Sequence, residues 1–65
     1  MNLHEATTAV DTVRETGADI FGYNSDKWFD AEDVLTENGD SERAKTAHYL
    51  AMRAYRNEEW NSGLN

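Results

Sequence analysis

The sequence predicts a small all-α domain of three helices, at about 2–16, 26–38 and 41–60, within a single domain that spans residues 1–65. Apolar residues recur at three- and four-residue spacing in long segments, and glycines stand where helices should stop. The one short segment that could form a strand, 18–25, has no second strand to pair with. A chain of 65 residues has room for one thin core. It contains no Cys, which excludes a disulfide framework and a cysteine nucleophile.

The first helix is predicted by an apolar stripe at helical spacing, made of Leu3, Ala6, Ala9, Val10 and Val13. Asn2, followed three residues later by Glu5, resembles a capping box. Gly17 stands where a residue in the left-handed conformation would end the helix. The segment 18–25 is predicted to be an apolar loop, whose Ile20 and Phe21 we expect to tuck under the helices.

The second helix is predicted to start at Ser25 or Asp26 and to end at the stop signal Asn38–Gly39. Its apolar residues share one face at helical spacing: Trp28, Ala31, Val34 and Leu35. We expect Trp28 to belong to the core. An alternative start stays open, in which Asp30 caps the helix and the two preceding aromatic residues lie in the loop.

The third helix is predicted to begin after Asp40 or Ser41 as its cap. One arc of this helix collects its apolar residues, namely Ala44, Ala47, Leu50, Ala51, Ala54 and Tyr55. The four alanines form a ridge that would allow close approach to the Ala6 and Ala9 side of the first helix. The opposite arc is basic and aromatic, with Lys45, Tyr49, Arg53, Arg56 and Trp60.

The charge of the chain is unevenly distributed around a net value of −7. Residues 15–42 contain nine acids and one base, whereas residues 43–57 contain four bases and no acid. Most of this surface would repel free nucleic acid or an anionic membrane, and it would steer a basic partner toward the acidic segment. No apolar run is long enough to span a bilayer, and no signal peptide is recognised. We therefore expect a cytoplasmic protein with no membrane partner.

Motifs for catalysis and metal binding are missing from the sequence. His4 and His48 are the only histidines, and they are not at metal-ligand spacing. Neither HExxH nor a nucleophile elbow occurs, and the acidic run does not fit the spacing of a calcium-binding EF-hand loop. We expect no enzymatic activity, no metal and no cofactor.

The central acidic segment is the candidate partner-binding face. Its members are Asp26, Asp30, Glu32, Asp33, Glu37, Asp40 and Glu42. Carboxylates on a rigid helix can present negative charge at intervals comparable with the phosphates of DNA. Such a surface would compete for the Lys- and Arg-lined groove of a nucleic-acid-binding protein. The alternative is a solvated helix face without a partner.

The run WFDAEDVLTE, residues 28–37, resembles a tryptophan-led acidic helix segment of the DNA-mimic anti-restriction proteins of lytic phages. The resemblance covers ten of the 65 residues and carries over Asp30, Glu32, Asp33 and Glu37 as charge-bearing positions only. The small size and lack of catalytic motifs are also similar in type to phage or mobile-element inhibitors, including anti-CRISPR proteins. These similarities imply an inhibitor or regulator in the host cytoplasm. It would bind a basic surface of a nucleic-acid-processing protein, such as a restriction or CRISPR effector.

Two other roles remain open for the basic–aromatic arc. Lys45, Tyr49, Arg53 and Arg56 could contact phosphates while Tyr49 or Trp60 stacks on a base, as in a small nucleic-acid-associated regulator. The net charge disfavours such direct nucleic-acid binding. Alternatively, Glu32 or Glu37 could pair with Arg53 or Arg56, either within one chain or between the chains of a homodimer. In that case the protein would be a homo-oligomeric structural accessory.

Overall fold

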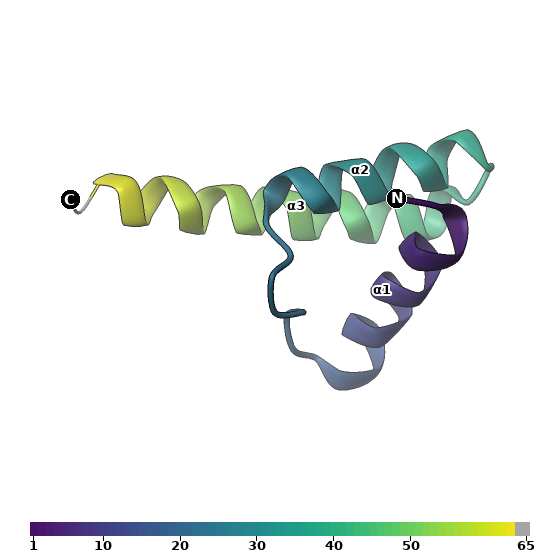
Figure 1. Ribbon diagram of the computed structural model, residues 1–65, viewed down its shortest axis with the longest axis horizontal. Coiled ribbons are helices and arrows are strands. Elements are labelled where there is room, and N and C mark those ends of the chain that lie inside the picture. The colour runs from purple at the N-terminus through teal and green to yellow at the C-terminus, as the bar shows by residue number, and fades with distance from the viewer. Residues whose placement is uncertain (64–65) are drawn as a thin grey trace.

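The computed structural model describes residues 1–63 and confirms an all-α domain of three helices. These are α1 (Leu3–Thr16), α2 (Ser25–Glu37) and α3 (Ser41–Gly63). Only residues 38–40 connect α2 to α3, so these helices form an antiparallel hairpin, and α1 lies across one face of it (Figure 1). The longer α3 extends past the start of α2 (Figure 1).

Each helix begins at a polar side chain that accepts a backbone hydrogen bond: Asn2 from Glu5, Asn24 from Lys27 and Asp40 from Arg43. These bonds satisfy donors that have no partner within the first turn. Gly17 and Gly39 follow the ends of α1 and α2 with φ of 69° and 79°, a conformation that favours glycine. The start of α2 at Ser25 excludes the alternative start after Asp30.

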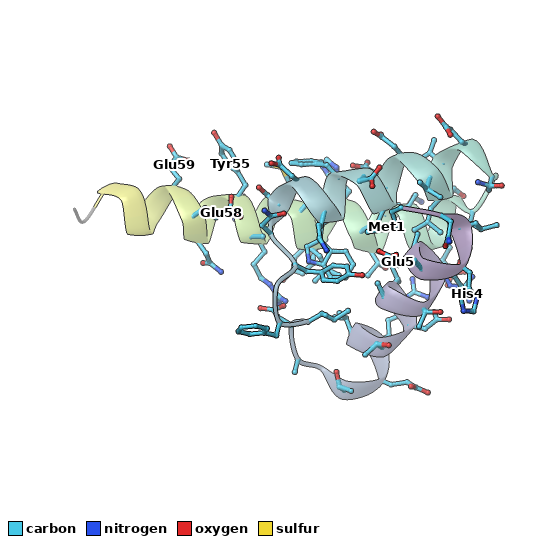
Figure 2. All side chains as sticks on the ribbon, viewed as in Figure 1. Met1, His4, Glu5, Tyr55, Glu58 and Glu59 are labelled. Carbon is cyan, nitrogen blue, oxygen red and sulfur yellow. The ribbon has the colours of Figure 1, made fainter. Side chains whose placement is uncertain are left out.

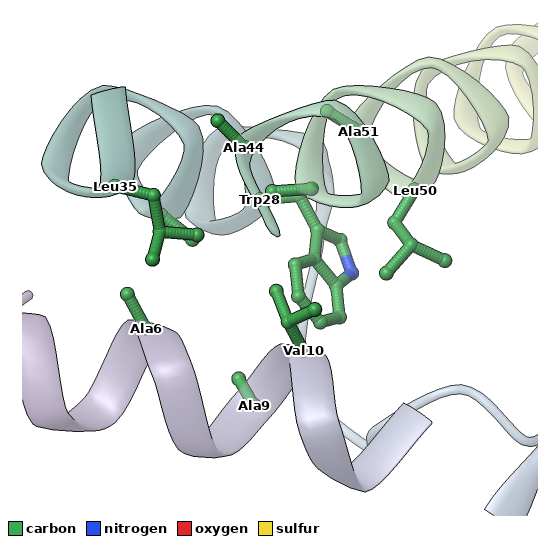
Figure 3. Packing of buried hydrophobic residues seen from close by; sticks show 10 residues of the cluster. Ala6, Ala9, Val10, Trp28, Leu35, Ala44, Leu50 and Ala51 are labelled. Carbon is green, nitrogen blue, oxygen red and sulfur yellow. The ribbon is translucent and has the colours of Figure 1, made fainter. Parts of the chain in front are cut away.

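The core lies where the three helices meet, and small residues dominate it (Figure 3). Its largest fully buried side chains are Trp28, Leu35 and Val10. Leu50 and alanines from all three helices complete it, namely Ala6, Ala9, Ala31, Ala44, Ala47 and Ala51. Trp28 therefore belongs to the core, as expected, because it lies within α2 with 2% of its surface exposed.

As a whole, α3 packs more closely with α2 than with α1. Three alanines of its ridge, Ala44, Ala47 and Ala51, share one buried cluster with Ala6 and Ala9 of α1. The short connection between α2 and α3 holds these two helices side by side, whereas α1 only crosses them. Most interhelical contacts of α3 are thus made within the hairpin.

Three predicted core residues lie in solvent instead. Leu3 is 41% exposed and Tyr55 is 50% exposed, because α1 covers only one face of the hairpin and its own first turn reaches past the core. The prediction for the loop holds for Ile20, which is partly buried against the core, and is wrong for Phe21. Phe21 is fully exposed, since it lies in the turn just before Gly22 and its side chain meets no helix.

Candidate interaction surface

Four of the seven predicted acids form a single line along α2: Asp26, Asp30, Asp33 and Glu37. Their spacing of four, three and four residues places them within about 60° of arc on the side of α2 opposite Trp28 and Leu35. All four are exposed. This acidic stripe runs for about 16 Å, at a rise of 1.5 Å per residue.

Most of the stripe is left to solvent. The Asp30 carboxylate accepts a hydrogen bond from the N-terminal ammonium at 3.0 Å, yet its side chain remains 51% exposed. Among residues 1–63, no ion pair engages Asp26, Asp33 or Glu37. Three carboxylates are thus available to a cation from outside.

The other three acids have internal partners. A carboxylate oxygen of Glu32 lies 3.1 Å from Nδ1 of His48. Asp40 pairs with Arg43 at 2.7 Å, and Glu42 pairs with Arg14 at 3.2 Å. Their charge is partly neutralised by the fold, so the structure divides the predicted face into the acidic stripe and three acids that help to hold the helices together.

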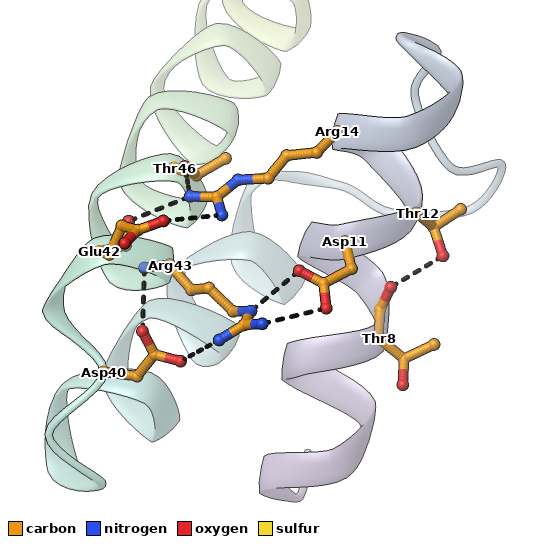
Figure 4. A network of polar contacts seen from close by, with 8 residues as sticks. All are labelled: Thr8, Asp11, Thr12, Arg14, Asp40, Glu42, Arg43 and Thr46. Atoms are coloured by element: carbon orange, nitrogen blue, oxygen red, sulfur yellow. Dashed lines mark hydrogen bonds and ion pairs between the residues drawn. The ribbon is translucent and has the colours of Figure 1, made fainter.

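Arg43 is the centre of a polar network between α1 and α3 that the sequence analysis did not anticipate (Figure 4). Its Nε and Nη2 donate to the two carboxylate oxygens of Asp11 at 2.9 and 3.2 Å, and its Nη1 donates to Asp40. Hydrogen bonds from Arg43 hold the pKa of Asp11 and Asp40 below its ordinary value. Arg14 adds a second link, because its Nη2 donates to the Thr46 hydroxyl at 2.7 Å.

The basic–aromatic arc of α3 is divided between internal and free side chains. Arg53 pairs with Asp19 of the loop and lies 5.6 Å from the centre of the Tyr49 ring. Lys45, Tyr49 and Arg56 are exposed, and no ion pair engages either cation within the described part of the chain. The side chain of Trp60, named with this arc, lies outside the described side chains.

Pairing of Glu32 or Glu37 with Arg53 or Arg56 within one chain is wrong for the residues described. Glu32 faces His48 instead, and Arg53 turns to the other flank of α3, toward Asp19. Glu37 ends α2 beside the start of α3, since the hairpin is antiparallel, and therefore lies far along the helix from both arginines.

Glu58 was also missed by the sequence analysis. Its carboxylate accepts hydrogen bonds from the backbone N–H and the hydroxyl of Ser25, at 2.9 and 2.7 Å. These two bonds lower the pKa of Glu58. Ser25 is the one buried polar residue among those described. Both its backbone N–H and its hydroxyl donate to Glu58. No local sequence signal links two residues so far apart.

A cleft of about 260 Å³ lies beside this contact, between the loop, α2 and α3. Its lining includes Tyr23, Trp28, Arg53 and Glu58. The Tyr23 ring packs on Trp28, with ring centroids 5.0 Å apart. Burial raises the pKa of the Tyr23 hydroxyl, and the negative charge of the nearby Glu5 raises it further.

Comparisons with known proteins do not identify a family or a function for this chain. The chain matches no protein-family model, no curated protein and no solved structure. Within residues 1–63, no three His, Asp or Glu side chains cluster as a metal site would require. None of the described helices has both the length and the apolar character needed to cross a membrane.

Proposed function

We propose that this protein is a non-enzymatic inhibitor or regulator. In this proposal its acidic stripe docks on a basic surface of a nucleic-acid-processing protein, such as a restriction or CRISPR effector. One observation carries the proposal: Asp26, Asp30, Asp33 and Glu37 form a straight exposed line opposite the core, and three of them have no ion-pair partner among residues 1–63.

The spacing of these carboxylates supports mimicry of one DNA strand. Four charges over about 16 Å give roughly one charge per 5 Å along α2. One strand of B-DNA carries a phosphate about every 3.4 Å of helix axis. The stripe is therefore somewhat less dense in charge than a DNA strand, but its charge has the same sign. A row of Lys and Arg that tracks a phosphate backbone would also attract it.

Rigidity favours the same role. Trp28 and Leu35 anchor the back of α2 in the core, and Asn24 caps its start. The backbone that carries the carboxylates therefore does not need to be ordered when a partner binds, so little backbone entropy is lost at the interface.

The test compares two double variants with the same change in net charge. The first reverses two residues of the stripe with Asp33→Lys and Glu37→Lys. The control reverses two exposed acids elsewhere with Glu15→Lys and Glu59→Lys. Each protein is added to a panel of purified restriction endonucleases and CRISPR effectors, and cleavage of plasmid DNA is measured.

We expect the wild type and the control to inhibit at least one effector, and excess duplex DNA to relieve the inhibition. The stripe variant should lose at least tenfold in potency, since a basic groove responds to the summed field of the stripe. Circular dichroism should show that both variants stay folded, because exposed helix charges contribute little to stability. Equal inhibition by the two variants, or none by the wild type, contradicts the proposal.

A further inference from the structure

The face of the α2–α3 hairpin opposite α1 has no covering element among the described residues. A groove of about 420 Å³ lies on it, lined by Glu32 and Thr36 of α2 together with Ser41, Ala44, Lys45 and His48 of α3. No α1 residue lines this groove. Farther along, the Phe29 ring meets the edge of His48, and Tyr55 points away from α1 (Figure 2). We call this surface, from the groove to Tyr55, the open face.

Opposite charges flank the open face. The acidic stripe borders it on the α2 side. On the α3 side, the residues opposite the buried alanines are Lys45, Tyr49, Met52 and Arg56, and all four are exposed. Their spacing is four, three and four residues, as in the acidic stripe. We call these residues the α3 row.

The two rows run level with each other along the hairpin. Contacts of Ser25 with Glu58 and of Glu32 with His48 fix the antiparallel register of α2 against α3. By interpolation, Asp26 lies within about one helical turn of the level of Arg56. Glu37 likewise lies within about one turn of the level of Lys45.

We propose that a second copy of this chain covers the open face in a twofold dimer. The twofold axis runs parallel to the hairpin helices and lies between the two open faces, which face each other. Each acidic stripe then lies against the α3 row of the other copy, at the same level along the helices. Asp26 then faces Arg56 of the partner subunit, and Glu37 faces Lys45 of the partner subunit. Twofold symmetry makes each of these contacts twice.

Charge selects this arrangement over the other face-to-face pairing. An axis perpendicular to the helices would bring stripe against stripe and base against base, and like charges at close range oppose such docking. In the favoured arrangement each α2 is antiparallel to the α3 of the other copy. The charged rows then lie on both sides of an interface that contains Phe29, His48 and Tyr55. In coiled coils, charged residues that flank the apolar interface set the orientation of the helices in the same way.

The size of the open face sets the strength expected. Two helices of about 10 Å width over the 20 Å length of α2 give roughly 400 Å² per copy. This is below the standard size of stable interfaces, so we expect a weak dimer, formed at about 0.1–1 mM chain.

A charge-swap experiment tests the geometry by sedimentation equilibrium up to about 1 mM protein in 0.15 M salt. One variant carries Asp26→Lys with Glu37→Lys, and the other carries Lys45→Glu with Arg56→Glu. We expect the wild type to dimerise and each variant alone to weaken association at least tenfold. An equimolar mixture should restore it as a heterodimer, because both rows are then complementary again.

Control measurements separate this geometry from simpler explanations. The Asp26→Lys, Glu37→Lys variant is less negative than the wild type, so its loss of association cannot come from net repulsion. Glu15→Lys on α1 makes a charge reversal away from the open face and should leave the dimer intact.

A wild type that stays monomeric at about 1 mM overturns the proposal and leaves the open face to a different protein. So does a mixture that stays monomeric, or a variant that dimerises alone. The inference does not rest on the proposed function, but a second copy and an effector would compete for the same acidic stripe. Lys45→Glu with Arg56→Glu spares the acidic stripe, so it should abolish the dimer and preserve effector inhibition.

Discussion

At the residue scale, Glu58 joins the end of the hairpin's longer helix to the first residue of the shorter one. Both of its carboxylate oxygens accept hydrogen bonds from Ser25, which is buried. A buried donor without an acceptor destabilises a fold, so Glu58 performs a structural task that its position near the chain end would not indicate.

Glu58→Gln should lower the melting temperature by several degrees at pH 7, because the amide keeps one acceptor and loses the charge that strengthens both bonds. The folded-state pKa of Glu58 is depressed below its ordinary value of 4.5. The charged form therefore stabilises the fold above pH 4.5, and this contribution is lost as the pH falls through the folded pKa. Melting curves from pH 7 to pH 3 should show the wild type and Glu58→Gln converging.

Glu59→Gln is the matched control for that measurement. Glu59 is exposed and points away from α1 (Figure 2), and no ion pair engages it within residues 1–63. Its melting curve should follow that of the wild type at every pH. An equal loss in both variants would show that general charge near the end of α3 matters and the Ser25 contact does not.

At the element scale, the alanine ridge of α3 is where a single side chain has the largest effect. Ala47 has no exposed surface, and a carboxylate there would be buried without a partner. Ala47→Glu should cost about 4 kcal/mol or more, a large part of the stability of a small domain. We expect circular dichroism to show loss of cooperative melting.

Ala18→Glu provides the matched substitution in the loop. Ala18 is exposed, so the same change of side chain should shift the melting temperature by only a few degrees at most. A cooperative transition near the wild-type temperature in Ala47→Glu would mean that this side of α3 is not the core.

The helices and their ends are predictable from sequence because their determinants are local. Asn2, Gly17 and Asp40 act within a few residues of where they stand, and apolar spacing identifies the buried side of each helix. The exposure of Tyr55 is not predictable in this way. It depends on which side of the hairpin α1 covers, and helical periodicity carries no information about that choice.

At the scale of the whole molecule, the charge distribution predicts that free DNA and RNA are not ligands. Arg14, Arg43 and Arg53 are held in internal ion pairs, which leaves few cations to contact phosphates on a chain of net charge −7. An electrophoretic assay at low salt with about 10 μM protein should show no shift. A clear shift that Arg53→Ala with Arg56→Ala removes would assign the function to the basic–aromatic arc.

The candidate site was predictable only in part. Sequence periodicity groups Asp26, Asp30, Asp33 and Glu37 on one line, because their spacing matches the helical repeat. It does not reveal that Glu32 meets His48 or that Asp40 meets Arg43, since those contacts depend on how α3 turns against α2. The separation of free from internally paired acids is a property of the packed molecule.

The three-residue connection between α2 and α3 has a consequence for folding kinetics. Most interhelical contacts join these neighbouring helices, so the contact order is low and folding in microseconds to milliseconds is expected. The hairpin can close as soon as its turn forms. A longer loop, residues 17–24, joins α1 to α2, so the docking of α1 on the hairpin costs more loop entropy. The acidic stripe lies wholly on α2, so it would already be displayed in the transition state for folding, before α1 is in place.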